Sequence, residues 1–298
     1  MSLTAGTAPF GPRPAGKFNF ELPRTRGLIY FEDHARRIRA RFAGETVVDS
    51  KRVKLMHESG HLPVYYFPEA EVRMDLLERT ERTSLCPWKG EAVYYTVRVG
   101  DKVAANAAWS YPEPLRDAPR LSGYLAFYWD AMEAWLEEDE LAIGHARDPY
   151  HRVDVLDTSR PVKVTVAGEV VAETTRARVL YETSLPPRWY IPAADVRQSA
   201  LVPSDSRTVC AYKGHASYWS VRAGGALSED LVWYYPEPRH EAARIKDYLC
   251  FYNEKVDLEI DGDLQERPRT PWSSSSSAPG GVGDEELRVE KTLVWPGK

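Results

Sequence analysis

The residues best suited to chemistry occur twice, at a fixed spacing of 124 positions. In the first set Arg52, Glu58 and Lys89 offer a guanidinium, a carboxylate and an ammonium group. Their counterparts in the second set are Arg176, Glu182 and Lys213. Because Arg presents a planar donor fork that matches a carboxylate, we expect Arg52 to pair with Glu58, and the second set likewise. The pair can be a structural bridge between strands, or Glu58 and Glu182 can act as general bases while the Arg anchors an anionic ligand.

Cysteines are matched in the same way. Cys86 and Cys210 each stand three positions before the matched Lys. A nearby ammonium group favours the thiolate, which would make them candidate nucleophiles, whereas a buried Cys acts as a small hydrophobic side chain. We favour the packing role. None of the seven histidines has a histidine at the matching position, so a Cys-His or Ser-His-Asp site cannot occur in both copies.

Aromatic residues complete each set. They are Tyr66, Trp109 and Tyr111, mirrored by Tyr190, Trp233 and Tyr235. Their rings offer flat apolar faces with polar tips beside the basic residues, a combination that suits a small polar or heterocyclic ligand. The alternative is that they fill a small β core. The predicted ligand-binding set is therefore Arg52, Glu58, Tyr66, Lys89, Trp109 and Tyr111, with Arg176, Glu182, Tyr190, Lys213, Trp233 and Tyr235.

Long matching segments surround these residues. Residues 86–94 read Cys-Pro-Trp-Lys-Gly-Glu-Ala-Val-Tyr and return at 210–218, while Trp-x-Tyr-Pro-Glu-Pro at 109–114 returns at 233–238. The match extends without a gap over about 110 residues, which is long enough for each copy to close its own core. One fold has been duplicated. We predict an extended N-terminal arm over 1–26, domains over 27–136 and 151–261, a linker over 137–150 and a flexible C-terminal tail over 262–298.

The rest of each copy must form strands that hold these residues. Residues 37–49 alternate around Gly44, and 162–171 repeat the pattern with more β-branched residues, which predicts a β-hairpin in each copy. A second hairpin is predicted over 92–109. The Tyr-Pro-Glu-Pro segment cannot continue a sheet because Pro lacks the N–H donor. Trp109 and Trp233 should therefore lie where a strand leaves an antiparallel sheet.

Three further segments complete the predicted elements. Prolines bracket the aromatic strand 63–68, which restricts it to an edge or an end of the sheet. Residues 69–77 follow as a short helical segment. Bulky apolar residues between 121 and 136 recur at helical spacing, which predicts a helix that leads into the acidic residues 137–140.

Composition excludes several classes of protein. A net charge of -5 and a pI near 5.9 argue against nucleic acid as a partner. A mean hydropathy of -0.47 and the lack of a long apolar run argue against a membrane span. The three Cys have no CxxC spacing, so we expect no metal, and no motif predicts a cofactor. The first residues lack an apolar segment after a basic start, so we expect a cytoplasmic protein.

The order of motifs resembles a known family. Asp49-Ser50-Lys51-Arg52, the Cys-x-x-Lys-Gly-x-Ala-x-Tyr segment and Trp-x-Tyr-Pro-x-Pro are similar to the family catalogued as domain of unknown function 427, DUF427, over nearly all of both copies. The resemblance implies a mainly β fold, with two tandem β-tent-like antiparallel-sheet domains, short helices and a pseudo-two-fold duplication. Relatives of that class include zinc-bound and reductase members, but their cysteine pairs are missing here. The family is also labelled nucleotidyltransferase-like, yet the chain has no Gly-Ser followed closely by Asp-x-Asp.

Three functions fit the sequence. The first is a tandem module that binds a small ligand in each copy. The second is a small-molecule enzyme, either nucleotidyltransferase-like or with Glu58 and Glu182 as acid or base. The third is a structural or interaction protein. Convergence of Arg52, Lys89 and Trp109 with Glu58 in one concave site would separate the first two from the third. We also expect the two copies to pack as a pseudo-dimer.

Overall fold

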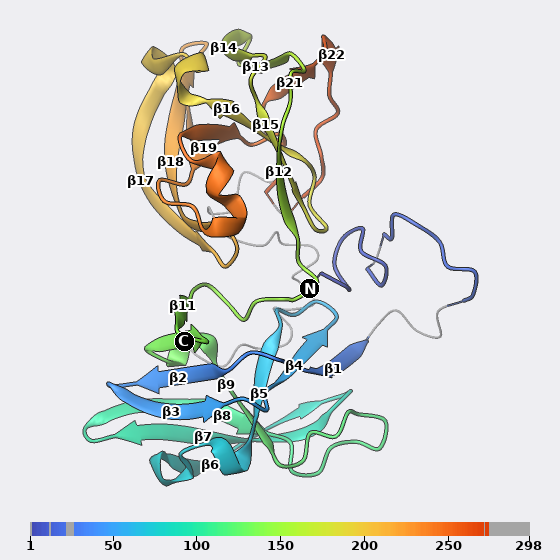
Figure 1. The fold of residues 1–298 in the computed structure, drawn as a ribbon, viewed down its shortest axis with the longest axis vertical. Coiled ribbons are helices and arrows are strands. Elements are labelled where there is room, and N and C mark those ends of the chain that lie inside the picture. The colour runs from blue at the N-terminus through green and yellow to red at the C-terminus, as the bar shows by residue number, and fades with distance from the viewer. Residues whose placement is uncertain (1, 12, 22–26, 271, 274–298) are drawn as a thin grey trace. The chain divides into compact units, whose positions relative to one another are not determined.

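The structure is a computed structural model, and it describes residues 2–11, 13–21, 27–270 and 272–273. The chain divides into two compact units, unit 1 (Met1–Asp148) and unit 2 (Pro149–Lys298). Both are built mainly from antiparallel β-strands in the same order (Figure 1). The predicted mainly β fold and the duplication are confirmed.

Unit 1 contains a large sheet of seven antiparallel strands in the order β1-β4-β5-β9-β8-β7-β6. The strands are β1 (Ile29–Asp33), β4 (Lys54–Glu58), β5 (Val64–Pro68), β6 (Leu77–Cys86), β7 (Gly90–Val99), β8 (Lys102–Ser110) and β9 (Tyr124–Phe127). The predicted hairpin over 92–109 is β7 and β8, which pair through Gly100 at φ +53°. Trp109 stands one residue before the end of β8, as predicted.

A small sheet covers one face of the large sheet. It has the order β11-β10-β2-β3, with β2 (Ile38–Phe42), β3 (Glu45–Ser50), β10 (Ala134–Glu137) and β11 (Glu140–Ala142). The predicted hairpin over 37–49 is β2 and β3, joined through Ala43 and Gly44 at φ +49° and +83°. Only Gly adopts the second of these values without strain.

Unit 2 repeats both sheets. Its large sheet consists of β12 (Val153–Asp157), β15 (Arg178–Glu182), β16 (Arg188–Pro192), β20 (Tyr248–Phe251), β19 (Ala226–Tyr234), β18 (Gly214–Ala223) and β17 (Leu201–Cys210). Its small sheet consists of β14 (Glu169–Thr174), β13 (Val162–Val166), β21 (Asp257–Ile260) and β22 (Asp263–Leu264). The strands β4 and β15 illustrate the offset, because each of their ends differs by 124 positions.

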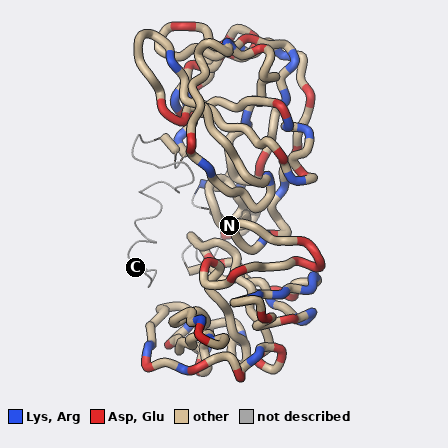
Figure 2. The backbone as a smooth tube through the Cα atoms, turned by 90° about the vertical axis from the view of Figure 1, so that its left-hand side faces the viewer, with Lys and Arg blue, Asp and Glu red and all other residues tan. Residues whose placement is uncertain are grey.

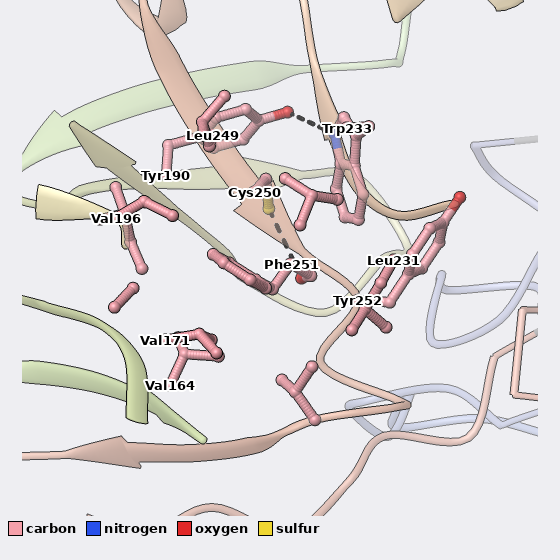
Figure 3. Packing of buried hydrophobic residues seen from close by; sticks show 14 of the residues in the cluster. Val164, Val171, Tyr190, Val196, Leu231, Trp233, Leu249, Cys250, Phe251 and Tyr252 are labelled. Carbon is pink, nitrogen blue, oxygen red and sulfur yellow. Dashed lines mark hydrogen bonds between the residues drawn. The ribbon is translucent and has the colours of Figure 1, made fainter. Parts of the chain in front are cut away.

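The central strands of the large sheet are buried on both faces. In β5 the side chains of Tyr65 and Phe67 enter the core between the two sheets, while Tyr66 and Val64 join a second, Tyr-rich cluster. This alternation follows from the two-residue period of a strand. In unit 2 the equivalent residues form one continuous core, in which Tyr190 and Trp233 pack beside Cys250 (Figure 3).

The predicted helix over 121–136 is wrong. The segment instead forms β9, the 3-10 turn η3 (Trp129–Ala131) and β10. Strand β9 pairs with β5 and β8, and three of its four residues are buried, so its apolar residues run without alternation. Such a run cannot be told from a buried helix by periodicity, and its aromatic content favours a strand.

Two shorter predictions need refinement. The helical segment over 69–77 consists of two 3-10 turns, η1 (Glu69–Glu71) and η2 (Met74–Leu76), before β6 begins. The aromatic strand β5 lies inside the large sheet, third of its seven strands, and not at its edge. The sheet tolerates Pro68 because this residue is the last of the strand.

The segments outside the two predicted domains are more structured than expected. Residues 137–150 contain β11, and Ala142 and Ala146 are buried in the core of unit 1. The N-terminal arm is not extended, since backbone hydrogen bonds such as Phe10 N–H to Leu3 O, at 2.9 Å, fold residues 2–11 into turns. In the C-terminal tail β22 is formed, while residues 271 and 274–298 lie outside the described residues. In the described part of the chain, no helix is long and apolar enough to cross a membrane.

Candidate functional site

The partner of Glu58 differs from the prediction. Lys89 Nζ donates a hydrogen bond to Glu58, whereas Arg52 Nε donates to Glu71 at 2.5 Å. The predicted Arg52–Glu58 pair is therefore wrong. The two residues are six positions apart around the extended strand β4, which corresponds to roughly 20 Å of chain.

In unit 2 the ion pairs differ from the prediction in the same way. Lys213 donates to Glu182, and Arg176 pairs with Asp195 at 2.6 Å, so the predicted Arg176–Glu182 pair is also wrong. His151 Nε2 lies 3.0 Å from the other oxygen of Glu182. Burial alone would raise the pKa of Glu182, but Lys213 and His151 outweigh it and lower the pKa to about 2. This carboxylate is ionised at neutral pH.

Aromatic side chains enclose each buried pair. The Trp109 indole donates to the Tyr66 hydroxyl at 3.2 Å, and Lys89 Nζ lies 5.7 Å from the centre of the Tyr111 ring. Burial raises the pKa of Tyr66 and of Tyr111, so both phenols keep their protons at neutral pH. The half-buried Cys86 packs against the same cluster.

The cluster of unit 2 is built alike. The Trp233 indole donates to Tyr190 at 2.9 Å (Figure 3), and burial raises the pKa of Tyr235 as it does that of Tyr190. Cys210 is half-buried against this core. Most predicted site residues therefore converge in each unit, but they fill a core, and Arg52 and Arg176 lie elsewhere. The single concave site expected from the sequence, with Arg52 beside Glu58, Lys89 and Trp109, is not formed.

The repeated Lys-Gly and Tyr-Pro-Glu-Pro motifs contact each other in each unit, and we call this contact the structural lock. The backbone N–H of Leu115 donates to the carbonyl of Lys89 at 3.0 Å. In unit 2 the backbone N–H of Arg239 donates to the carbonyl of Lys213 at the same distance. Gly90 has φ +105°, and a Cβ there would lie 3.2 Å from the carbonyl oxygen of Glu113. The close contact and the positive φ both disfavour a residue with a side chain at this position. These contacts give the recurring motifs a structural role.

The structural lock predicts that replacing Gly90 destabilises unit 1 much more than replacing Gly44. We expect Gly90→Ala to destabilise unit 1 by roughly 2–3 kcal/mol, because it adds a close backbone contact to the strain of a positive φ. Gly44→Ala is the control, since its φ is +83° but no atom lies within 4 Å of the added Cβ. Its cost should stay near 1 kcal/mol. Urea denaturation followed by hydrogen exchange would measure both, and equal costs would contradict the lock.

Arg52 lines an open pocket at the other end of β4. The pocket has a volume of about 570 Å³, and Asp33, His34, Lys51, Arg52, Lys54 and Tyr124 contribute to its wall. Unit 2 has a pocket of about 370 Å³ lined by Asp157, Thr158, Ser159, Thr175, Arg176 and Tyr248. The Asp, the Arg and the Tyr occupy equivalent positions in the two copies.

The recurring Ser-x-Arg or Thr-x-Arg segment holds the guanidinium in place. The Ser50 hydroxyl accepts the N–H of Arg52 at 3.1 Å and donates to Glu71, which also binds Arg52. Thr174, Arg176 and Asp195 repeat this arrangement. Each Arg side chain remains 68% exposed. The arrangement leaves a fixed and accessible guanidinium on the pocket wall.

The pocket Asp forms an ion pair with one or more basic side chains in both units. Lys54 Nζ lies 2.6 Å from Asp33, and Asp157 accepts hydrogen bonds from Arg178 and Arg244. Sequence reasoning overlooked Asp33 and Tyr124, although both recur at the 124-residue spacing that revealed the other pairs. Within the described residues, no group of three or more His, Cys, Asp or Glu side chains could hold a metal ion.

Comparison with known proteins agrees with the internal repeat. A family model described as a domain of unknown function, DUF427, matches residues 30–138 and 154–262. The two matched regions contain one buried Glu–Lys pair and one Arg-lined pocket each. The curated proteins contain no match to this chain.

Proposed function

Because the chain belongs to the DUF427 family in two tandem copies, we propose that each copy binds a small polar ligand in the pocket beside Arg52 or Arg176. The observation that carries the proposal is the recurrence of the pocket at equivalent positions, with the same Asp, Arg and Tyr. Two pockets of several hundred Å³ are large enough for small metabolites.

The pocket residues supply complementary interactions. The exposed guanidinium of Arg52 can bind a carboxylate, phosphate or carbonyl group, and a charge-assisted hydrogen bond contributes about 1.5–3 kcal/mol. Tyr124 supplies an aromatic wall and packs edge-on against Phe31, with ring centres 5.7 Å apart. In unit 2 the Arg178 guanidinium lies 4.5 Å from the centre of the Tyr248 ring. An anionic or polar head with a flat organic body suits both walls.

The buried Glu–Lys clusters are less suitable as sites. Glu58 and Lys89 are 9% and 8% exposed and satisfy each other, so a ligand would have to break a buried ion pair. Removing one partner from such a pair costs about 3–5 kcal/mol. A carboxylate with a pKa of about 2, such as Glu182, is also a weak base at neutral pH. Binding in the open pocket therefore accounts for the geometry better than acid–base catalysis.

A thermal-shift screen of the full chain against metabolites, nucleotides and amino-acid derivatives tests the proposal. A ligand at about 100 times its Kd stabilises the folded state by about 2.7 kcal/mol. We expect the stabilisation by each hit to be lost in the double variant Arg52→Ala/Arg176→Ala, because its guanidinium anchors are gone.

The matched control is Arg73→Ala. Arg73 is a half-exposed arginine that pairs with Asp75 at 2.7 Å and does not line either pocket. This variant should keep every hit. Hits that survive in the double variant, or that disappear in Arg73→Ala, would contradict the proposed site.

A further inference from the structure

The loop that follows the Tyr-Pro-Glu-Pro motif has a different conformation in the two units. It covers residues 115–123 in unit 1 and 239–247 in unit 2. Both loops start at the structural lock, and both later bury an apolar residue completely, Leu121 or Ile245. Unit 2 winds the loop into the 3-10 helix η6 (His240–Ile245), the orange coil beside β12 in Figure 1. In unit 1 the same part of the chain forms only a turn.

Arg244, in η6, reaches the wall of the unit 2 pocket. Its guanidinium pairs with Asp157, which lines the pocket. It also donates to the carbonyl of Val155 in β12 at 2.5 Å. Arg178 donates to Asp157 at 2.9 Å and, in addition, to the backbone carbonyl of Arg244. Arg178 thereby holds η6 against the pocket wall.

The equivalent residues of unit 1 are not joined in this way. Arg120 corresponds to Arg244, and Asp33 corresponds to Asp157. Within the described residues the exposed Arg120 makes no hydrogen bond or ion pair, and Asp33 pairs with Lys54 alone. Figure 2 shows basic and acidic residues interspersed along both units, so an unpaired arginine here is not the result of a basic surface. A cation and a carboxylate that form an ion pair in unit 2 are therefore separate in unit 1.

One replacement explains why only unit 2 is held in the closed form. Position 54 is Lys where unit 2 has Arg178. The planar guanidinium of Arg178 binds a carboxylate and the loop carbonyl together, in fixed directions. The compact ammonium of Lys54 binds Asp33 and, in the described part of the chain, donates no hydrogen bond to the loop. The loop of unit 1 therefore lacks the contact that fixes η6.

A ligand can supply what Lys54 does not. An exposed ion pair contributes little in water, so Arg120 and Asp33 have little reason to pair while the pocket is open. The open pocket has a volume of about 570 Å³, against about 370 Å³ in unit 2. A bound ligand would exclude water from Asp33 and so strengthen its attraction to Arg120. Ligand binding and pairing would therefore favour each other.

We propose that Arg120 is a positioning residue of the unit 1 pocket. When a ligand binds beside Arg52, Arg120 pairs with Asp33 and the pocket closes. Unit 2 represents the closed form, which Arg178 and Arg244 maintain without a ligand. This inference rests on the proposed function, and it makes unit 1 the copy that changes shape on binding.

Replacing one residue tests the closure without any ligand. Lys54→Arg gives unit 1 the guanidinium of Arg178. We therefore expect the guanidinium hydrogens of Arg120 to exchange with water at least tenfold more slowly, as measured by NMR in the full chain. Lys102→Arg is the control, because Lys102 is exposed and lies outside both pocket linings. Equal exchange rates at Arg120 in the two variants would overturn the proposal.

Titration of the full chain with benzoate tests the response to a ligand, since benzoate joins a carboxylate to a flat ring. We expect the Nε–H signal of Arg52 to shift, and the exchange at Arg120 to slow over the same range of benzoate concentrations. Arg120→Gln should weaken benzoate binding at Arg52 by about fivefold and leave binding at Arg176 unchanged. Arg116→Gln removes the same charge from an exposed position in the same loop, and it should change binding by less than twofold.

The outcomes separate this inference from the proposed function. If benzoate shifted Arg52 while the exchange at Arg120 stayed the same, the positioning role would be wrong and the proposed function would survive. Equal effects of Arg120→Gln and Arg116→Gln would lead to the same conclusion. If neither Arg52 nor Arg176 responded to benzoate or to any hit of the screen, the proposed function would fail, and the positioning role with it.

Discussion

Replacing Lys89 with Met is expected to destabilise unit 1 by about 3–5 kcal/mol, because Glu58 would stay buried without its ion-pair partner. Both side chains are about one-tenth exposed, and their hydrogen bond joins the β6–β7 turn to the end of β4. Hydrogen exchange resolved to peptides of β4 and β7 would report the loss in unit 1 independently of unit 2.

The double variant Glu58→Leu/Lys89→Met should recover most of that stability, since similarly sized apolar residues can replace a buried ion pair at little cost. Arg73→Met is the control for an exposed pair and should cost at most about 1 kcal/mol. If Lys89→Met cost no more than Arg73→Met, the buried Glu58–Lys89 pair would not stabilise the contact between the β6–β7 turn and β4.

Acidification from pH 5 to pH 2 is expected to remove about 3 kcal/mol of stability from unit 2 through Glu182 alone. The pKa of this carboxyl is about 2 in the folded state against 4.5 in the reference state, because Lys213 and His151 outweigh the effect of burial. Between these values the unfolded chain binds more protons, so stability falls as the pH falls. The difference of roughly 2.5 pKa units corresponds to about 3 kcal/mol.

The double variant Glu182→Leu/Lys213→Met isolates this contribution from those of other carboxylates, such as Glu254 beside Arg188. Its loss of stability over the same pH range should be smaller than that of the native chain by about the same amount. Parallel pH profiles for the two proteins, measured by hydrogen exchange in β15 and β18, would show that Glu182 does not have the proposed role.

Local patterns predicted the hairpins well. Alternation around Gly44 and Gly100 specifies both the strands and their turns, because each turn requires a positive φ next to an alternating segment. The segment 121–136 could not be assigned in this way. Its strand β9 pairs with β5, nearly sixty residues earlier in the chain, and burial on both faces removes the alternation. Pairing over that distance leaves no local signal in the segment itself.

The candidate site was predicted only in part. Matching residues between the copies identified Arg52, which lines the proposed pocket, and also Lys89 and Gly90, which make structural contacts. Internal similarity cannot distinguish a residue retained for folding from one retained for binding. The sequence could not show whether Arg52 or Lys89 pairs with Glu58. The answer depends on how the β6–β7 turn folds back onto β4.

The most direct test of the central claim is the NMR response of the arginine side chains in the full chain to a hit from the thermal-shift screen. The account predicts that the Nε–H signal of Arg52 or Arg176 shifts on addition of the hit, while that of Arg73 does not. A hit that stabilises the protein yet leaves Arg52 and Arg176 unchanged would contradict it, because the ligand would then bind outside both pockets.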